Sequence, residues 1–242
     1  MNNKKVIYTA LFGDYDNLQE PAERFKGWDF ICFTDNKDLN SNIWKIIRVC
    51  PELPPQLENR KYKILPHIYL KNYDISLYID SNIKIKRNPI DLVNKYLANS
   101  LIAMPKHFKN NCIYKEAKDI IKNGKERKDI VLKQIKFYKD QGFPENFGLA
   151  ENGIILRKHN AKPVIKLMEC WWEQINKFAK RDQLSFMYCV WKNKIDVKFM
   201  EESARGSKYF RIYPHKKNYK YKLIGKCIDI VRYIYLNYII KL

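Results

Sequence analysis

Two oxygen-bearing side chains, Asp80 and Asn82, lie two positions apart at the end of the apolar segment Ser76–Ile83. Alternate residues of an extended chain point to the same side, so both side chains can reach one ligand. Carboxylate and amide oxygens bind hard divalent cations such as Mn²⁺ or Mg²⁺, and a cation held in this way can bind a diphosphate. The alternative is a turn in which both side chains bond only to nearby backbone groups.

A pair of basic side chains precedes this segment. Arg60 and Lys63 lie one turn apart in Leu57–Lys71, where the spacing of the apolar residues is helical. Side chains at this spacing share one face of a helix, where they can bind a phosphate together. A solvated basic helix face is the alternative. Pro66 should kink or break the helix, because proline lacks the backbone N–H needed at an interior position.

Short apolar segments typical of buried strands must position these residues. We expect strands at Lys5–Phe12, Asp29–Asp35, Ser76–Ile83, Ser100–His107 and Glu151–Lys158. Helical patterns lie between them, at Leu57–Lys71, Asp91–Ala98, Tyr114–Tyr138, Pro163–Phe178 and Asp182–Trp191. The alternation predicts an α/β fold with a mostly parallel sheet covered by helices on both faces. Ligands bind at the carboxyl ends of strands in such sheets, which singles out Gly13–Asp16, Asp35 and Asp80–Asn82.

Several motifs resemble those of known glycosyltransferases. Arg60, Lys63 and Pro66, followed by Leu77–Asn82, resemble a block of family 8 (glycogenin-like) glycosyltransferases that ends in Asp-x-Asp. A closer similarity is to a glycosyltransferase family of bacteria and plants that was long catalogued as a domain of unknown function. That similarity is carried by Tyr8–Asp16, Phe33–Asp35, Ser81–Ile83, His107 with Cys112–Ala117, and Arg181–Phe186. The resemblance implies a GT-A-type, Rossmann-like fold with a mixed, mostly parallel sheet.

The resemblance also implies roles for individual residues. Nucleotide-sugar binding is assigned to Thr9, Ala10, Phe12, Gly13, Asp35, Arg60, Lys63, Asp80 and Ser81. The acceptor side comprises Asn152, Gly153 and His107, although His107 can equally fill a polar pocket. The catalytic pair is Asp182 and Gln183, with Asp182 orienting the donor sugar or acting on the acceptor hydroxyl. The implied metal ligands are Asp80, Asn82 and His215.

The implied metal site departs from the family pattern at two positions. Asn82 replaces the second aspartate, which lowers the charge of the ligand set and with it the expected dependence on Mn²⁺ or Mg²⁺. His215 matches the late histidine of family 8 only loosely, and a surface histidine in a basic tail is the alternative. The family 8 likeness favours retention at the anomeric carbon by analogy, whereas inversion would make Asp182 the general base.

The net charge of +20 is concentrated near the C-terminus. From Arg205 to Leu242, ten Lys or Arg residues accompany a single acid and seven of the 17 tyrosines. We therefore predict a glycosyltransferase domain at 1–204 and a basic, Tyr-rich tail at 205–242, with an amphipathic helix from Leu223 onward. A tail of this kind suits an anionic membrane surface, an acidic glycan or nucleic acid, and a solvated basic face is the alternative.

The rest of the composition bears on location. The sequence contains neither a signal-peptide-like stretch nor an apolar run long enough to span a bilayer. Its six cysteines are scattered without a CxxC pair, which suits buried thiols in a reducing compartment. We expect a cytoplasmic protein that is peripheral at the inner face of the membrane if its tail docks there.

Two classes of function fit these features. The first is a glycosyltransferase that moves a sugar from a nucleotide-sugar, with a UDP-sugar favoured, to a glycan or lipid-linked acceptor in surface polysaccharide synthesis. The second is a non-catalytic basic module that binds anionic glycan or RNA. Nucleic acid is the weaker candidate because the sequence has no RNP, KH or zinc-finger motif. A sugar nucleotidyltransferase is disfavoured because Phe12–Asp16 is too acidic to bind a triphosphate.

Overall fold

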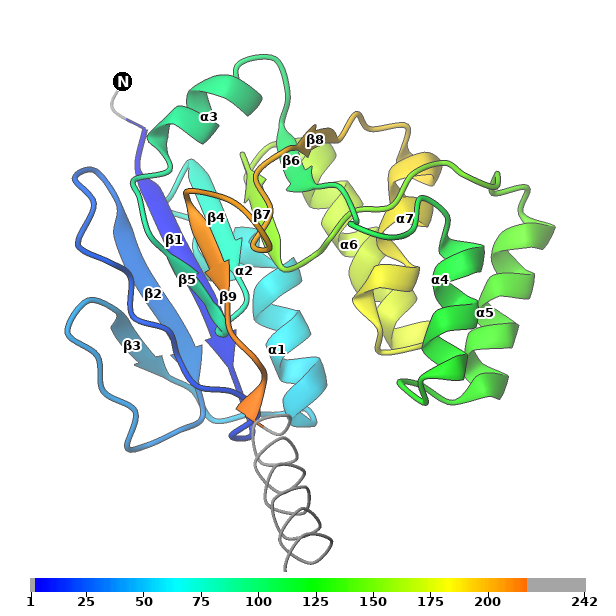
Figure 1. Cartoon of the computed structure of the whole chain (residues 1–242), viewed down its shortest axis with the longest axis horizontal. Helices are drawn as coiled ribbons and strands as arrows, with labels where there is room; N and C mark the ends of the chain where they lie inside the picture. Colours follow the sequence, from blue (N-terminus) through cyan, green and yellow to red (C-terminus); the bar gives the residue numbers. More distant parts are fainter. Residues whose placement is uncertain (1–2, 217–242) are drawn as a thin grey trace, which may run out of the picture.

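The computed structural model describes residues 3–216 and has a seven-stranded sheet at its centre (Figure 1). The strand order is β3-β2-β1-β4-β7-β6-β8. The bounds are β1 Lys5–Leu11, β2 Asp29–Thr34, β3 Lys45–Arg48, β4 Ile75–Ile79, β6 Ile102–Pro105, β7 Ile154–Arg157 and β8 Lys198–Met200. In this sheet β7 runs antiparallel to both neighbours, and every other pairing is parallel. The predicted α/β fold with a mixed, mostly parallel sheet is confirmed.

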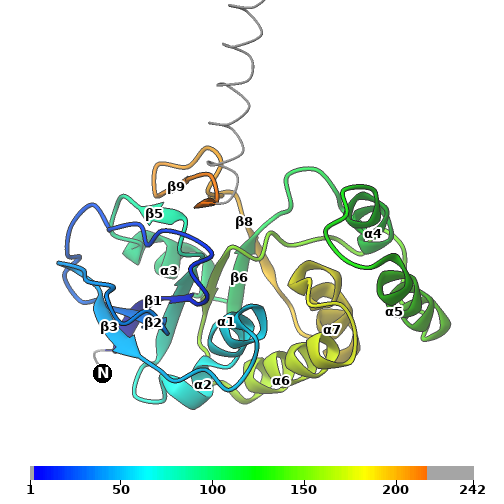
Figure 2. The same cartoon turned by 90° about the horizontal axis from the view of Figure 1, so that it is seen from below.

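Helices and a small second sheet cover the two faces of the central sheet (Figure 2). On one face lie α1, α2, α6 and α7, and on the other lie α3 and the antiparallel pair of β5 with β9. The α4–α5 pair lies at one side, beyond α7. The bounds are α1 Pro55–Ile64, α2 Pro66–Tyr69, α3 Ile90–Tyr96, α4 Ile113–Lys122, α5 Lys128–Asp140, α6 Lys162–Lys177, α7 Phe186–Asn193, a 3₁₀ turn η1 Asp182–Leu184, β5 Ile83–Ile85 and β9 Phe210–Ile212.

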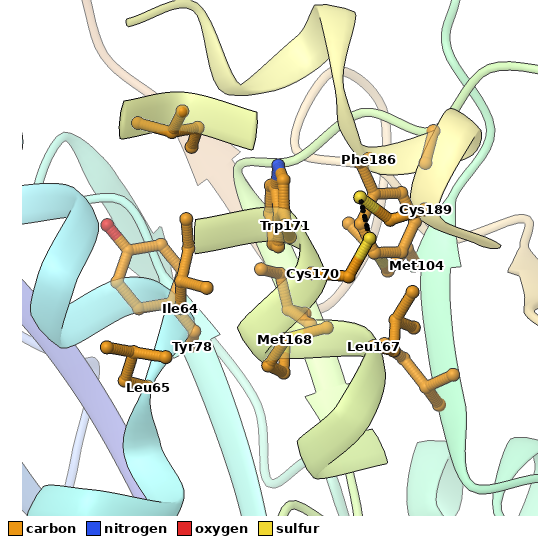
Figure 3. Packing of buried hydrophobic residues seen from close by; sticks show 14 of the residues in the cluster. Ile64, Leu65, Tyr78, Met104, Leu167, Met168, Cys170, Trp171, Phe186 and Cys189 are labelled. Carbon is orange, nitrogen blue, oxygen red and sulfur yellow. Dashed lines mark hydrogen bonds between the residues drawn. The ribbon is translucent and has the colours of Figure 1, made fainter. Parts of the chain in front are cut away.

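Each face of the sheet has its own apolar core, because successive strand residues point to opposite faces. Tyr8 and Tyr78 belong to the cluster shared with α1, α6 and α7, whereas Ile7 and Leu77 belong to the cluster shared with α3 and the second sheet. Figure 3 shows part of the first cluster around Trp171, which is fully buried. The sheet is therefore held between two packed layers, which gives its carboxyl edge a fixed geometry.

The cysteines are mostly buried, as the sequence indicated. Four of the five described cysteines are buried and free, and Cys50 is the exposed one. Cys170 of α6 and Cys189 of α7 meet inside the first core, with 2.9 Å between their Sγ atoms (Figure 3). The Cys170 pKa is lowered, mainly by its hydrogen bond with Cys189, although burial opposes this.

The structure confirms the predicted break in one helix and divides another helix that was expected to be continuous. The helix expected at Leu57–Lys71 is interrupted before Pro66, as predicted, and gives α1 and α2. The single helix expected at Tyr114–Tyr138 was wrong, because α4 ends at Lys122 and α5 begins at Lys128. Gly124 has a φ of +59°, and Lys125 N donates to Ile120 O at 3.0 Å. A left-handed glycine with this hydrogen bond terminates a helix, and the prediction of one continuous helix did not take Gly124 into account.

The predicted strands form, and the structure adds others. The segment Ser76–Ile83 proved to be β4, a turn containing Asp80, and the start of β5. The short strands β3, β5, β8 and β9 were not expected, because three or four residues carry little periodicity. Pairing of β9 with β5 packs part of the predicted tail on the domain. The predicted amphipathic helix from Leu223 lies outside the described residues, and within residues 3–216 no helix is long and apolar enough to cross a membrane.

Candidate active site

The turn that follows β4 presents Asp80 at the carboxyl edge of the sheet. Its backbone is fixed because Asp80 N donates to Gly153 O at 2.9 Å and Ile83 N donates to Asp80 O at 2.8 Å. Tyr78, two residues earlier, donates its hydroxyl to Asp80 Oδ1 at 2.9 Å. About a third of the Asp80 side chain remains exposed, at 36%. Asp80 is therefore anchored on one oxygen and open to a ligand.

Two cations and two carboxylates converge beside this turn. Lys63 Nζ lies 2.7 Å from Asp182 Oδ2 and 3.4 Å from Asp80 Oδ1. Arg60 Nε lies 3.4 Å from the same oxygen of Asp182. The formal charges of these four side chains balance, which makes their burial tolerable. We call this set, Arg60, Lys63, Asp80 and Asp182, the charged cluster.

The members of the charged cluster differ in protonation behaviour. Burial opposes ionisation of Asp182, but Arg60 and Lys63 outweigh it and hold the Asp182 pKa well below its usual range. Burial also lowers the Arg60 pKa, but Asp182 and Asp80 outweigh that effect and raise it overall. Asp182 is thus a permanent anion and a weak proton acceptor, a state better suited to orienting a sugar than to removing a proton.

Helix α1 carries Arg60 and Lys63 and is held in a position from which both reach Asp182. It begins at Pro55, whose ring pre-sets the first helical turn. Asn59 Nδ2 donates to Ala10 O at 2.5 Å, and Arg60 Nη1 donates to Asn59 Oδ1 at 2.8 Å. These bonds tie the helix to the end of β1. Sequence reasoning missed Asn59 because a lone asparagine on a helix carries no distinctive pattern.

The end of β1 forms the turn predicted to cradle the nucleotide. Gly13 has a φ of +66°, and a Cβ there would lie 2.6 Å from Pro55 Cβ, so only glycine fits. Its N–H donates to both carboxylate oxygens of Asp35 at 3.1 Å. The side chains of Thr9 and Phe12 are buried, which leaves only their backbone for a ligand. The roles of Asp35, Ala10 and the buried Ser81 toward a nucleotide stay predictions.

The acidic turn after Gly13 meets the chain near its described C-terminal end. His215 Nδ1 lies 2.8 Å from Asp16 Oδ2, and Lys216 N donates to Asp16 Oδ1 at 3.2 Å. The hydrogen bond with Asp16 raises the His215 pKa, burial opposes this, and the negative charge of Asp80 adds to the rise. Tyr213 N, two residues before His215, donates to Asn82 O at 2.9 Å, which brings this segment to the turn that holds Asp80. We call the contacts of Asp16 with His215 and Lys216 the clasp.

The three predicted metal ligands are brought to one region but not into a finished site. Asn82 is buried, and its Nδ2 donates to Tyr213 O at 2.8 Å, so its oxygen is the atom left for a cation. His215 is occupied by Asp16. Within residues 3–216 no three His, Cys, Asp or Glu side chains are arranged to hold a metal. The donor set suits a hard cation at Asp80 and Asn82, and His215 keeps Nε2 as its remaining donor atom because its contact with Asp16 uses Nδ1.

The predicted acceptor side is split by the structure. Gly153 packs against Asp80, since a Cβ at Gly153 would lie 3.1 Å from Asp80 Oδ2. Asn152 is 97% buried, and neither polar atom of its side chain finds a hydrogen-bond partner within the described chain. His107 turns toward its own loop, where Nδ1 accepts from Asn110 N at 2.9 Å. Asn152 and Gly153 therefore border the charged cluster, whereas His107 fills a local polar position.

The predicted catalytic pair, Asp182 and Gln183, is held by backbone contacts. Trp171 Nε1 donates to Asp182 O at 3.1 Å, and Gln183 Nε2 donates to Ala150 O. Trp171 is fully buried, so its ring packs in the core and is not exposed to a sugar. These contacts connect α6, η1 and the segment before β7, and they place Asp182 opposite Asp80 across Lys63.

Residues 1–209 match the family model described as the TOD1/MUCI70, glycosyltransferase-like domain. The chain belongs to this family. The probable hexosyltransferase MUCI70 of Arabidopsis thaliana is 26% identical over 211 residues, covering 75% of this chain and 36% of that protein. Another TOD1/MUCI70 relative, the alkaline ceramidase TOD1 of Arabidopsis thaliana, is 23% identical over 220 residues, covering 76% of this chain and 47% of that protein.

This chain thus spans less than half the length of either curated relative. Among solved structures, the galactosyltransferase LgtC in complex with donor and acceptor sugar analogues aligns with a TM-score of 0.47 at 11% identity. The alignment covers 83% of this chain and 74% of that one. Family membership confirms the predicted glycosyltransferase family.

Proposed function

We propose that this chain transfers a hexosyl group from a nucleotide-sugar, with a UDP-sugar favoured, to a glycan or lipid-linked acceptor. The observation that carries the proposal is the charged cluster at the carboxyl end of β4. Breakage of the bond between sugar and diphosphate leaves negative charge on the nucleotide. Preorganised cations close to that charge lower the barrier, because they need no reorganisation during the reaction.

Each residue of the cluster has a distinct part in this mechanism. Lys63 and Arg60 would exchange part of their contact with Asp182 for the leaving phosphate oxygens. Asp80 and the Asn82 oxygen would hold the cation, Mn²⁺ or Mg²⁺, which supplies charge stabilisation at the diphosphate. Asp182 would accept hydrogen bonds from donor-sugar hydroxyl groups and fix the anomeric carbon opposite the acceptor.

The acceptor would enter beside Asn152. A buried amide with two unpartnered polar atoms costs stability unless a ligand or water satisfies it. Asn152 precedes Gly153, which touches Asp80, so a hydroxyl bonded to Asn152 would lie next to the donor. Gln183, held on Ala150 O, would complete this side of the site.

A donor-hydrolysis assay tests the proposal without knowledge of the acceptor. The protein is incubated with a panel of UDP- and GDP-sugars and Mn²⁺, and the released diphosphate is followed. We expect slow hydrolysis of one donor, reduced at least about 100-fold in Asp182→Asn, as for loss of an electrostatic contact at the reacting centre. Asp196→Asn, an exposed position, is the matched control. Hydrolysis of no donor, together with cleavage of ceramide, would contradict a transferase.

The setting of the reaction forms part of the same proposal. Cytoplasmic surface polysaccharide synthesis, with the tail from residue 205 docked on an anionic inner membrane surface, would bring the enzyme to lipid-linked acceptors. Removing the residues after Lys220 should abolish binding to vesicles of phosphatidylglycerol. Unchanged binding would rule out docking by that part of the tail. Stabilisation by polyanions but by no nucleotide would instead support the non-catalytic module.

A further inference from the structure

A cavity of about 480 Å³ lies between the C-terminal half of α7 and the segment that follows α5. Three aromatic, two aliphatic, one amide and two cationic residues line it: Phe147, Tyr188, Trp191, Val190, Ile195, Gln141, Lys192 and Lys194. No carboxylate is among the lining residues. Neither the family match nor the charged cluster assigns it a role.

The aromatic wall is preformed by packing behind it. Tyr188 is 1% exposed and stacks on Tyr138, with 3.9 Å between ring centroids. Phe143 contacts both Trp191, at 5.6 Å, and Phe147, at 5.5 Å, between centroids. Side chains fixed in this way lose little conformational entropy when they bind a ligand.

The cations at the rim are placed by the end of α7. Lys194 is left-handed, with a φ of +52°, and its N–H donates to Trp191 O at 3.2 Å. Ile195 N donates to Val190 O at 3.3 Å, which completes the termination of the helix. A left-handed lysine costs about 1–2 kcal/mol relative to its usual conformation. The exposed Lys192 and Lys194 therefore flank the aromatic wall, with no acid in the lining to neutralise them.

The cavity is connected to the charged cluster along two segments of chain. Asp182 begins η1, and Trp191 lies in the last turn of α7, nine residues further along the chain. The segment that lines the cavity with Phe147 continues directly to Asn152 and Gly153 at Asp80. Both segments therefore run from the cavity to residues beside the charged cluster.

We propose that this cavity binds an anionic sugar residue of the acceptor glycan, several residues from the point of transfer. An aromatic face covers the apolar face of a sugar ring, and lysines pair with a carboxylate such as that of a uronic acid. The naming of the ligand as acceptor rests on the proposed function, whereas the binding of anionic oligosaccharide does not.

Binding of defined oligosaccharides tests this site. We would titrate the full chain with tetrasaccharides of galacturonic, glucuronic and mannuronic acid, and with neutral maltotetraose, by isothermal titration calorimetry. We expect one acidic tetrasaccharide to bind at least about tenfold more tightly than maltotetraose. Lys192→Gln/Lys194→Gln should remove that preference, and Trp191→Ala should weaken both ligands.

The controls separate charge, folding and function. Lys133→Gln/Lys166→Gln removes the same charge from exposed positions outside the lining and should leave the affinity within about twofold. If this control loses the preference equally, or if no acidic tetrasaccharide is preferred, the proposed site is wrong. Intact donor hydrolysis with no effect of Lys192→Gln/Lys194→Gln on binding overturns only this inference. Intact binding with no donor hydrolysis overturns only the proposed function.

Discussion

Arg60 and Arg157 both lie within reach of Lys63, yet their guanidinium groups meet different partners. Arg60 faces the carboxylate of Asp182, and carboxylates raise its pKa despite burial. Arg157 is fully buried, and within residues 3–216 its hydrogen-bond partners are all neutral, namely the Tyr8 hydroxyl, Lys63 O and Met168 Sδ. Burial lowers the Arg157 pKa, and Tyr8 offsets this only in part.

The difference separates the ion-paired side chains of the charged cluster, Arg60 and Lys63, from Arg157 and Tyr8, which hold the backbone of Lys63. In the proposed mechanism, a phosphate replaces part of the carboxylate contact of Arg60 and of the Lys63 amine. Arg157 and Tyr8 hold the backbone oxygen of Lys63, which the end of α1 before Pro66 leaves in need of donors. Arg157 is therefore a positioning residue, and the two arginines should respond differently to substitution.

The largest expected loss of stability follows substitution of Lys63, which pairs with Asp182 and Asp80. Lys63→Met leaves the buried carboxylate of Asp182 with Arg60 alone and removes the nearest cation from Asp80. Loss of one partner of a buried ion pair costs about 3–5 kcal/mol. Urea denaturation should show a fall of that size in the free energy of unfolding, and Lys63→Met/Asp182→Asn should recover part of it. A fall no greater than that of a surface pair, about 1 kcal/mol or less, would contradict the described burial.

A smaller effect is expected on the supporting side. Arg157→Met removes the guanidinium donors to Lys63 O and to the Tyr8 oxygen, although Lys63 O keeps the bond from the Tyr8 hydroxyl, and it also removes a buried charge without a carboxylate partner. Unsatisfied buried acceptors cost about 1–3 kcal/mol, and loss of the charge offsets part of this. The same urea assay should place Arg157→Met between wild type and Lys63→Met. The reverse ranking would mean that the hydrogen bonds of Arg157 contribute more to stability than the ion pairs of Lys63.

Low pH should destabilise the protein through protonation of Asp182. Its pKa is depressed in the folded protein, so its contribution to stability is complete above the unfolded pKa of about 3.9 and is lost as pH falls through the folded pKa. The free energy of unfolding of wild type should therefore fall below about pH 5, and that of Asp182→Asn should fall less steeply. Denaturation curves from pH 3 to pH 6 measure both slopes, and equal slopes would remove Asp182 as the source.

The smallest effect is expected at the clasp. Asp16 raises the His215 pKa, so the stabilising charged pair is present below the unfolded value of about 6.5 and is lost as pH rises through the folded pKa. Because the His215 side chain is 40% exposed, His215→Gln should cost roughly 0–1 kcal/mol. If neutral His215 binds the metal, Mn²⁺ affinity should rise between pH 6 and pH 8 in wild type only. The same rise in His215→Gln would assign the metal elsewhere.

Sequence reasoning reached the parts of the site that lie at strand ends or one helical turn apart. Asp80, Arg60 and Lys63 converge as the spacing indicated, because parallel strands deliver their ends to one edge. The role of Asp182 was inferred from the family resemblance alone, because more than a hundred residues of chain separate it from Lys63 and no local spacing relates the two. The division of α4 from α5 required attention to Asn123 and Gly124, a known helix-ending pair.

Other features depend on contacts that no local pattern encodes. Arg157 ends the apolar strand β7, is fully buried, and donates to Lys63 O. The clasp joins Asp16 to His215 across most of the chain, and a three-residue pairing of β5 with β9 brings them together. Such long-range pairings are decided by packing of the complete fold and leave no periodic trace in either segment.

The most direct test of the central claim is the binding of UDP with Mn²⁺ by wild type and by Asp80→Ala, followed by thermal shift. The account predicts that UDP with Mn²⁺ raises the Tm of wild type, that UDP alone does so less, and that Asp80→Ala shows neither rise. Asp196→Ala, an exposed position, should behave as wild type. An undiminished rise in Asp80→Ala would place the nucleotide away from the charged cluster and contradict the account.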